Sequence, residues 1–95
     1  MIGKRLKKNL VSMFSIKLTA KAKRELKNLS KLDRLQVGEI IEDLKEDPLM
    51  GKPLSRELIR KFSYRVGAYR VIYLVHREDK VITILSAGYR GTVYN

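Results

Sequence analysis

The sequence predicts a small α+β domain, because the pattern of apolar residues changes along the chain from strand to helix and back to strand. One stretch of alternating apolar residues comes first, and two stretches with helical spacing follow it. Three short stretches rich in Val, Ile and Tyr complete the chain, separated by turn residues. With 95 residues the chain forms one domain, which we place at residues 14–95 after a basic N-terminal extension, residues 1–13.

The first strand and the first helix are predicted within residues 14–28. Residues 14–18 alternate apolar and polar side chains, which is typical of a half-buried strand. Thr19 is the expected N-cap of a helix that runs to Asn28, because a threonine hydroxyl can accept a hydrogen bond from the first helical turn. One face of this helix carries lysines, and the other is apolar: Ala22, Leu26 and, just past its end, Leu29.

A second helix is predicted from Asp33, as its N-cap, to about Glu46. Asp47-Pro48 ends it, because the residue before a proline avoids the helical region. Half of the ten acidic residues lie in this helix or just after it: Glu39, Glu42, Asp43, Glu46 and Asp47. Such a helix is poorly suited to hold RNA, so we expect a nucleic-acid surface on the other side of the sheet.

The segment that follows the second helix, residues 50–61, is predicted to be a loop, because Gly51 and Pro53 interrupt regular structure. Leu54 and Leu58 are expected to anchor this loop to the core. The loop leads into the first of the three C-terminal strands.

The C-terminal strands are predicted at residues 62–66, 69–76 and 81–87. Gly67-Ala68 is short enough for a tight hairpin, and Glu78-Asp79 marks the next turn. Side chains alternate between the two faces of a strand, so Arg65 and Arg70 share the open face if the helices cover the other one. A β-bulge between these two strands would break this relation.

The composition indicates a phosphate-rich partner. The chain has 21 Lys+Arg against 10 Asp+Glu, a formal net charge of +11, which favours RNA or DNA. It has no cysteine, so a reducing cytosol suits it, and no apolar run is long enough to cross a membrane. The basic extension is either a short helix lying on RNA or an anionic surface, or a segment ahead of an internal start at Met13. No metal-ligand cluster and no Gly-rich nucleotide loop occurs in the sequence, so we expect no cofactor.

From about residue 14 to residue 94 the sequence resembles the RelE/ParE superfamily of bacterial and archaeal toxins. The resemblance is carried by the helical hairpin with Ala20, Ala22, Leu26 and Leu29, the linker DPLMGKPL, the block YRVGAYRVIY and the tail SAGYRGTVY. It implies an antiparallel-dominated sheet of about four strands, with an N-terminal helical hairpin packed on one face. RelE-type members cleave messenger RNA in the ribosomal A site, ParE-type members poison DNA gyrase, and a cognate antitoxin neutralises each.

The RelE resemblance implies a site made of Arg65, Arg70, Arg90 and Tyr94. Arg70 is shared with ParE-like sequences, whereas Arg90 together with Tyr94 favours RelE. Ser63 stands where many RelE relatives have a lysine or arginine, which leaves the site one cation short unless Lys61, Lys52 or the N-terminus fills in. The remaining RNA-binding candidates are lysines of the first helix: Lys21, Lys23 and Lys27.

Cleavage of RNA by its own 2′-hydroxyl requires a base, neutralisation of the phosphate charge and assistance to the leaving oxygen. Arginines stay protonated, so they suit phosphate binding, and Tyr94 is either the base or a residue that stacks on an RNA base. Our hypothesis is a cytoplasmic, metal-independent endoribonuclease, the toxin of a type II toxin–antitoxin pair. It acts on mRNA in the ribosomal A site and forms a hetero-oligomer with an antitoxin whose acidic segment covers the basic face. The alternatives are a ParE-like gyrase inhibitor and a non-catalytic basic RNA-binding relative.

Overall fold

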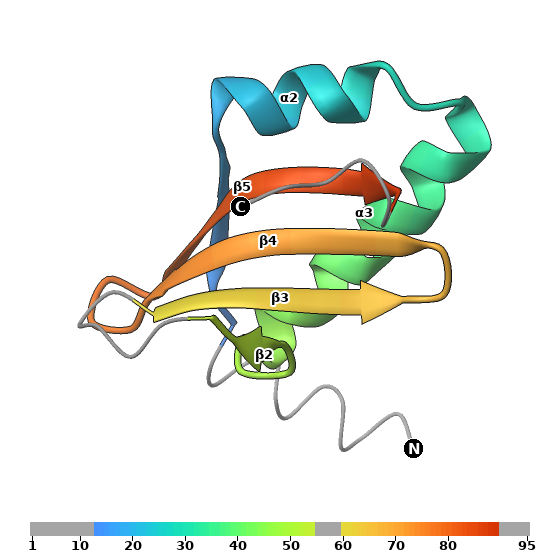
Figure 1. Cartoon of the computed structure of the whole chain (residues 1–95). Coiled ribbons are helices and arrows are strands. Elements are labelled where there is room, and N and C mark those ends of the chain that lie inside the picture. The colour runs from blue at the N-terminus through green and yellow to red at the C-terminus, as the bar shows by residue number, and fades with distance from the viewer. Residues whose placement is uncertain (1–12, 55–59, 90–95) are drawn as a thin grey trace.

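The computed structural model describes residues 13–54 and 60–89, which form a five-stranded sheet and two helices (Figure 1). The strand order is β1-β5-β4-β3-β2; β1 runs parallel to β5, and all other neighbours are antiparallel. This confirms the α+β class and the antiparallel-dominated sheet, with one strand more than expected. The elements are β1 (Ser15–Leu18), α2 (Ala20–Lys27), α3 (Lys31–Glu46), β2 (Lys52–Pro53), β3 (Arg60–Val66), β4 (Tyr69–His76) and β5 (Val81–Tyr89).

The additional strand is β2, which lies within the segment that the sequence predicts as a loop. It has only two residues and pairs with β3 at the edge of the sheet. Leu54, just after it, is 39% exposed, so the expectation that Leu54 anchors the loop is wrong. An edge strand has neighbours on one side only, so residues next to it remain accessible to solvent. The backbone of Leu54, rather than its side chain, holds the segment, because its N–H donates to the Lys61 carbonyl at 2.6 Å. Leu58 lies outside the described residues.

Both helices begin at a hydroxyl cap. The Thr19 hydroxyl accepts from the Ala22 N–H at 3.1 Å, as expected, and donates to the Leu85 carbonyl at 3.2 Å. The cap of α3 is Ser30, whose hydroxyl accepts from the Asp33 N–H at 3.1 Å, so the assignment of Asp33 as the cap is wrong. A serine three residues earlier satisfies the same orphan donor and starts the helix at Lys31, which leaves the Asp33 carboxylate available for a tertiary contact.

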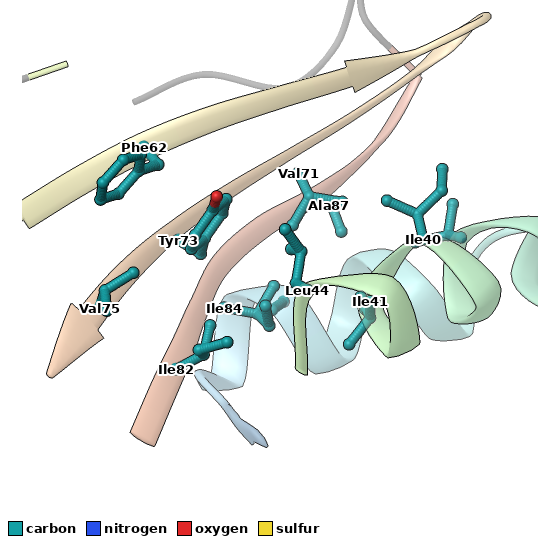
Figure 2. Packing of buried hydrophobic residues seen from close by; sticks show 12 residues of the cluster. Ile40, Ile41, Leu44, Phe62, Val71, Tyr73, Val75, Ile82, Ile84 and Ala87 are labelled. Atoms are coloured by element: carbon teal, nitrogen blue, oxygen red, sulfur yellow. The ribbon is translucent and has the colours of Figure 1, made fainter. Parts of the chain in front are cut away.

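The core lies between the sheet and the helices. In Figure 1, α3 lies behind the strands and α2 lies along β5. Figure 2 shows the apolar side chains of α3 pointing toward those of β3, β4 and β5. The Phe62 and Tyr73 rings stack at 5.4 Å between their centroids. The strand residues on this face are Phe62, Val71, Tyr73, Val75, Ile82, Ile84 and Ala87, so the opposite face carries the alternating residues, as the sequence predicts.

Glu25 of α2 completes the edge of β5 where β1 ends. The register pairs β1 with β5 only as far as Ile84. Beyond that point the Glu25 carboxylate accepts from the Ser86 hydroxyl at 2.7 Å and from the Ala87 N–H at 3.0 Å. Ser86 is only 1% exposed, so the carboxylate satisfies polar groups that would otherwise be buried without a partner.

The sheet contains a register shift, but not between the arginine strands. Ile72 pairs with Ser86 and Tyr73 with Ile84, so Leu85 is an extra residue in β5. Between β3 and β4 the register is continuous from one end to the other. The face assignment of Arg65 and Arg70 therefore holds.

Candidate nucleic-acid interface

Arg65 and Arg70 lie directly opposite each other on β3 and β4. They point to the face that α3 does not cover, which we call the open face; its residues on β2, β3 and β4 include Lys52, Lys61, Ser63, Arg65 and Arg70. Like charges placed opposite each other on one face of an antiparallel pair destabilise a sheet. An anion bound between the two guanidinium groups would offset this repulsion. The pairing of two arginines on one face is therefore the first indication of an anion-binding site.

A pocket of about 440 Å³ opens between these residues and the segment around β2. The described residues that line it bring two guanidinium groups, one ammonium group and two hydroxyls, and none of them carries a carboxylate. Its lining residues are Met50, Lys52, Leu54, Ser63, Tyr64, Arg65 and Arg70.

The Nε atom of Arg70 is buried and has no hydrogen-bond partner within residues 13–54 and 60–89. A buried charged donor without an acceptor is costly, because the lost hydration of the N–H is not replaced. A phosphate oxygen in the pocket would provide the missing acceptor, and phosphate geometry suits a guanidinium group well. The environment of Arg70 is therefore typical of a residue that binds an anionic ligand.

The charge of the described strands is of one sign. None of their residues is acidic, whereas the acidic residues of the described ranges lie on the helices, at Asp47 or in the turn between β4 and β5. The basic residues of the five strands are Lys17, Lys52, Arg60, Lys61, Arg65 and Arg70. The sheet therefore attracts polyanions. This agrees with the expectation that a nucleic-acid surface lies on the side of the sheet away from the acidic helix α3.

The position of β2 beside the pocket depends on Tyr73. Its hydroxyl donates to the Pro48 carbonyl at 2.8 Å and accepts from the Gly51 N–H at 3.0 Å, and burial raises the pKa of Tyr73 to about 12. A Cβ at Gly51 would lie 2.6 Å from the Tyr73 hydroxyl and 3.0 Å from the Ser63 carbonyl oxygen. Gly51 thus permits the close approach that brings Lys52 next to Ser63.

A second polar cluster joins α3 to the ends of β4 and β5. Asp33 accepts hydrogen bonds from the Tyr69 hydroxyl, at 2.5 Å, and from the Tyr89 hydroxyl. The two tyrosine rings stack with centroids 5.5 Å apart. The hydrogen bond to Asp33 raises the pKa of Tyr69 to about 12, and the two hydroxyl donors, Tyr69 first, lower the pKa of Asp33. This cluster fixes Tyr89, the residue that directly precedes Arg90 in the sequence.

The predicted site residues divide into three groups. Arg65 and Arg70 are together in the pocket, and Lys52 is beside them. Lys61 is on the same face opposite Leu74 but does not line the pocket, and Lys21, Lys23 and Lys27 are exposed on α2, which packs against β5 at the other side of the sheet. Arg90 and Tyr94 lie outside the described residues.

The sequence did not identify Met50, Leu54 and Tyr64 as lining residues. No local pattern marks them, because their place depends on the pairing of the two-residue strand β2 with β3. Within residues 13–54 and 60–89 no group of three or more His, Cys, Asp or Glu side chains could hold a metal ion. No helix in the described ranges is long and apolar enough to cross a membrane.

Comparison with known proteins gives matches over most of the chain. Residues 16–94 match the family model described as the ParE toxin of the type II toxin–antitoxin system parDE. Toxin RelG of Mycobacterium tuberculosis (strain ATCC 25618 / H37Rv) is 36% identical over 83 residues, which cover 85% of this chain and 95% of the relative. Among solved structures, the toxin–antitoxin complex RelBE2 of M. tuberculosis matches with a TM-score of 0.73 and 36% identity, covering 82% of this chain and 99% of the matched chain. The archaeal RelE-RelB complex of Pyrococcus horikoshii OT3 matches with a TM-score of 0.73 and 28% identity, covering 84% and 98%.

Proposed function

Since this chain belongs to the RelE/ParE superfamily of toxins of type II toxin–antitoxin systems, we propose that it is a ribosome-dependent mRNA endonuclease acting in the cytoplasm. The observation that carries the proposal is the buried Nε of Arg70, which has no partner among the described residues and lies in a pocket whose described lining has three cations and no carboxylate. A pocket of this kind binds phosphate, and the family likeness makes the phosphate of a messenger RNA the candidate.

In the proposed reaction the 2′-hydroxyl of a ribose attacks the adjacent phosphorus. A bond forms between the 2′ oxygen and phosphorus, and the bond to the 5′ oxygen of the next nucleotide breaks, so the products are a 2′,3′-cyclic phosphate and a 5′-hydroxyl. The 2′-hydroxyl proton leaves to a base, and a proton reaches the departing 5′ oxygen. Negative charge builds up on the phosphoryl oxygens, and Arg65 and Arg70 are placed to stabilise it.

The proposed roles of the two C-terminal residues follow the RelE resemblance. Arg90 contributes a third guanidinium to the phosphate, and Tyr94 either accepts the 2′-hydroxyl proton or stacks on a base. The anchoring of Tyr89 by Asp33 supports Arg90 in this role, since it fixes the residue before it.

We further propose that an antitoxin with an acidic segment covers the open face and keeps RNA out. The basic side chains of the described pocket lining support this, and both similar structures named above are complexes with an antitoxin. Contacts between opposite charges weaken as salt increases, so binding to the antitoxin should weaken at high salt. At a salt concentration of about 1 M the screening length is only about 3 Å, so charge–charge contacts are strongly weakened. Tight binding of the antitoxin that is unchanged at this salt concentration would contradict a contact made by an acidic segment.

A ParE-like action on DNA gyrase is the second candidate, because the family model that matches residues 16–94 is that of ParE. The two candidates separate in a reconstituted translation reaction followed by primer extension on the message, run beside a gyrase supercoiling assay. The endonuclease gives cuts at codon positions that disappear in Arg70→Ala and leaves gyrase active. Intact message together with inhibited gyrase would support the ParE-like action instead.

A further inference from the structure

The edge strand β2 places one lysine toward the pocket. Lys52 pairs with Ser63 and Pro53 with Phe62. Phe62 belongs to the core, so Pro53 faces the helices and Lys52 faces the open side, in the same row as Ser63. Ser63 has a short side chain, and it leaves space beside Arg65 that a longer residue at this position would fill.

Strand spacing places Lys52 closer to Arg65 than Lys61 is. Neighbouring strands lie about 4.8 Å apart and residues rise about 3.4 Å along a strand, so the Cα atoms of Lys52 and Arg65 are about 8 Å apart. Lys61 is four residues from Arg65 on the same strand, a separation of about 14 Å. The side chains of Lys52 and Arg65 can therefore meet on one phosphate, whereas Lys61 lies a full nucleotide spacing further away.

The backbone around Lys52 is held on both sides. The residue before it, Gly51, donates its N–H to the buried Tyr73 hydroxyl, and Leu54 donates to the Lys61 carbonyl. A lysine on a fixed backbone loses less conformational freedom on binding than one on a free loop. Met50 and Leu54, 41% and 39% exposed, add apolar surface to the same pocket, which suits the ribose or base of a nucleotide better than a free phosphate.

We propose that Lys52 is a further cation of the phosphate site, bound to the same RNA phosphate as Arg65 and Arg70 and placed across the strand pair from Ser63. This inference rests on the proposed function in its choice of RNA as the ligand. It identifies β2 as part of the substrate site and gives the site a cation that position 63 does not supply.

The test measures binding rather than cleavage. The probe is a short, fluorescently labelled single-stranded RNA with 2′-O-methyl groups throughout, which cannot be cut by 2′-hydroxyl attack, and the readout is its anisotropy as toxin is added. Lys52→Ala should weaken binding about fivefold to tenfold, the scale of one charge-assisted contact at a partly exposed site. It should also reduce the slope of log affinity against log salt by about 0.7, the value for one phosphate contact on a single strand.

Charge-matched variants separate a contact in the pocket from a general effect of net charge. Lys61→Ala removes one charge from the same face and should weaken binding less than twofold to threefold. In the Lys52→Ala background, Ser63→Lys returns the charge to the pocket and should restore affinity, whereas Ser15→Lys returns it to the exposed edge strand β1 and should not. Thermal unfolding checks that every variant is folded.

Two results would overturn the proposal. One is an equal loss in Lys52→Ala and Lys61→Ala, and the other is equal rescue by Ser63→Lys and Ser15→Lys; in both cases Lys52 acts only through the net charge. Inorganic phosphate should compete with the RNA only at much higher concentration, because it lacks the nucleoside that Met50 and Leu54 contact. Lys52-dependent binding without any cleavage of a natural message would refute the proposed function and leave this inference standing.

Discussion

Tyr73→Phe should destabilise the protein and loosen the substrate site at the same time. Tyr73 is fully buried in the core, and its hydroxyl connects that core to the segment that leads into β2. The substitution removes only the oxygen, so the stacking against Phe62 and the apolar packing remain. Two backbone groups, the Pro48 carbonyl and the Gly51 N–H, then lose their partner.

The expected loss of stability follows from the surroundings of those two groups. A buried polar group left without a partner costs about 1–3 kcal/mol. Pro48 and Gly51 are only half-buried, so water reaches them in part and the low end applies to each. We therefore expect about 2 kcal/mol less free energy of unfolding, from a total of about 5–14 kcal/mol for a domain of this length. The midpoint of thermal unfolding should fall by about 10 °C.

Denaturant unfolding at pH 7, where Tyr73 is neutral in both states, measures this change. A double-mutant cycle with Gly51→Ala tests the cause, because the added Cβ would clash with the Tyr73 hydroxyl. Gly51→Ala should cost less in the Tyr73→Phe background than in the wild type, although contact with the Ser63 carbonyl keeps part of the cost. An unfolding free energy for Tyr73→Phe within about 0.3 kcal/mol of wild type, or additive effects in the cycle, would refute the reasoning.

Two further clusters give measurable effects. In the first cluster, the hydrogen bonds of Asp33 lower its pKa below 3.8 and raise the pKa of Tyr69 from 10 to about 12. These bonds therefore contribute fully to the free energy of unfolding between about pH 4 and pH 10. This contribution is lost as the pH falls below about 4 or rises from about 10 to about 12. Asp33→Asn should therefore flatten the acidic and the basic limb of a plot of unfolding free energy against pH. Limbs as steep as those of the wild type would contradict a stabilising role of these hydrogen bonds. In the second cluster, Glu25→Ala should lower the free energy of unfolding by about 2–3 kcal/mol, because it leaves the buried Ser86 hydroxyl and the Ala87 N–H without an acceptor. Glu25→Gln keeps an acceptor oxygen and should lower it by less than about 1 kcal/mol. Both values are measured by denaturant unfolding. Equal losses in the two Glu25 variants would contradict this assignment.

The sequence predicted those parts of the fold that local patterns determine. Strand β4 begins and ends where its Val, Ile and Tyr pattern does, and the hairpin turns at Gly67-Ala68, where Gly67 has a φ of 58° that favours glycine. The common face of Arg65 and Arg70 was predicted from the alternation of side chains along the two strands. These features depend on residues that are close together in the chain, so one sequence is enough to predict them.

The features that the sequence missed depend on distant residues. Strand β2 is too short to show an alternating pattern, and its place is set by Tyr73, 22 residues from Gly51. Asp33 looked like a helix cap, but its carboxylate binds tyrosines 36 and 56 residues away, at positions 69 and 89. The unsatisfied Nε of Arg70 is likewise a property of its burial and not of its neighbours in sequence.

The central claim is that the pocket around Arg70 carries the chemistry of RNA cleavage. The most direct test is the single-turnover rate of mRNA cleavage on ribosomes programmed with a defined message. The message carries either a ribose or a 2′-deoxyribose at the cut site, and the proteins compared are wild type, Arg70→Met and Arg60→Met. Arg60 is a matched control, because it is an exposed arginine of the neighbouring strand β3 that does not line the pocket.

We predict a cut that leaves 2′,3′-cyclic phosphate and 5′-hydroxyl ends and does not occur in the 2′-deoxy message. Arg70→Met should lower its rate about 10²-fold to 10³-fold, as expected for loss of one donor to the transition-state charge, while Arg60→Met stays near the wild-type rate. Cleavage of the 2′-deoxy message, or equal rates for Arg70→Met and Arg60→Met, would contradict the central claim.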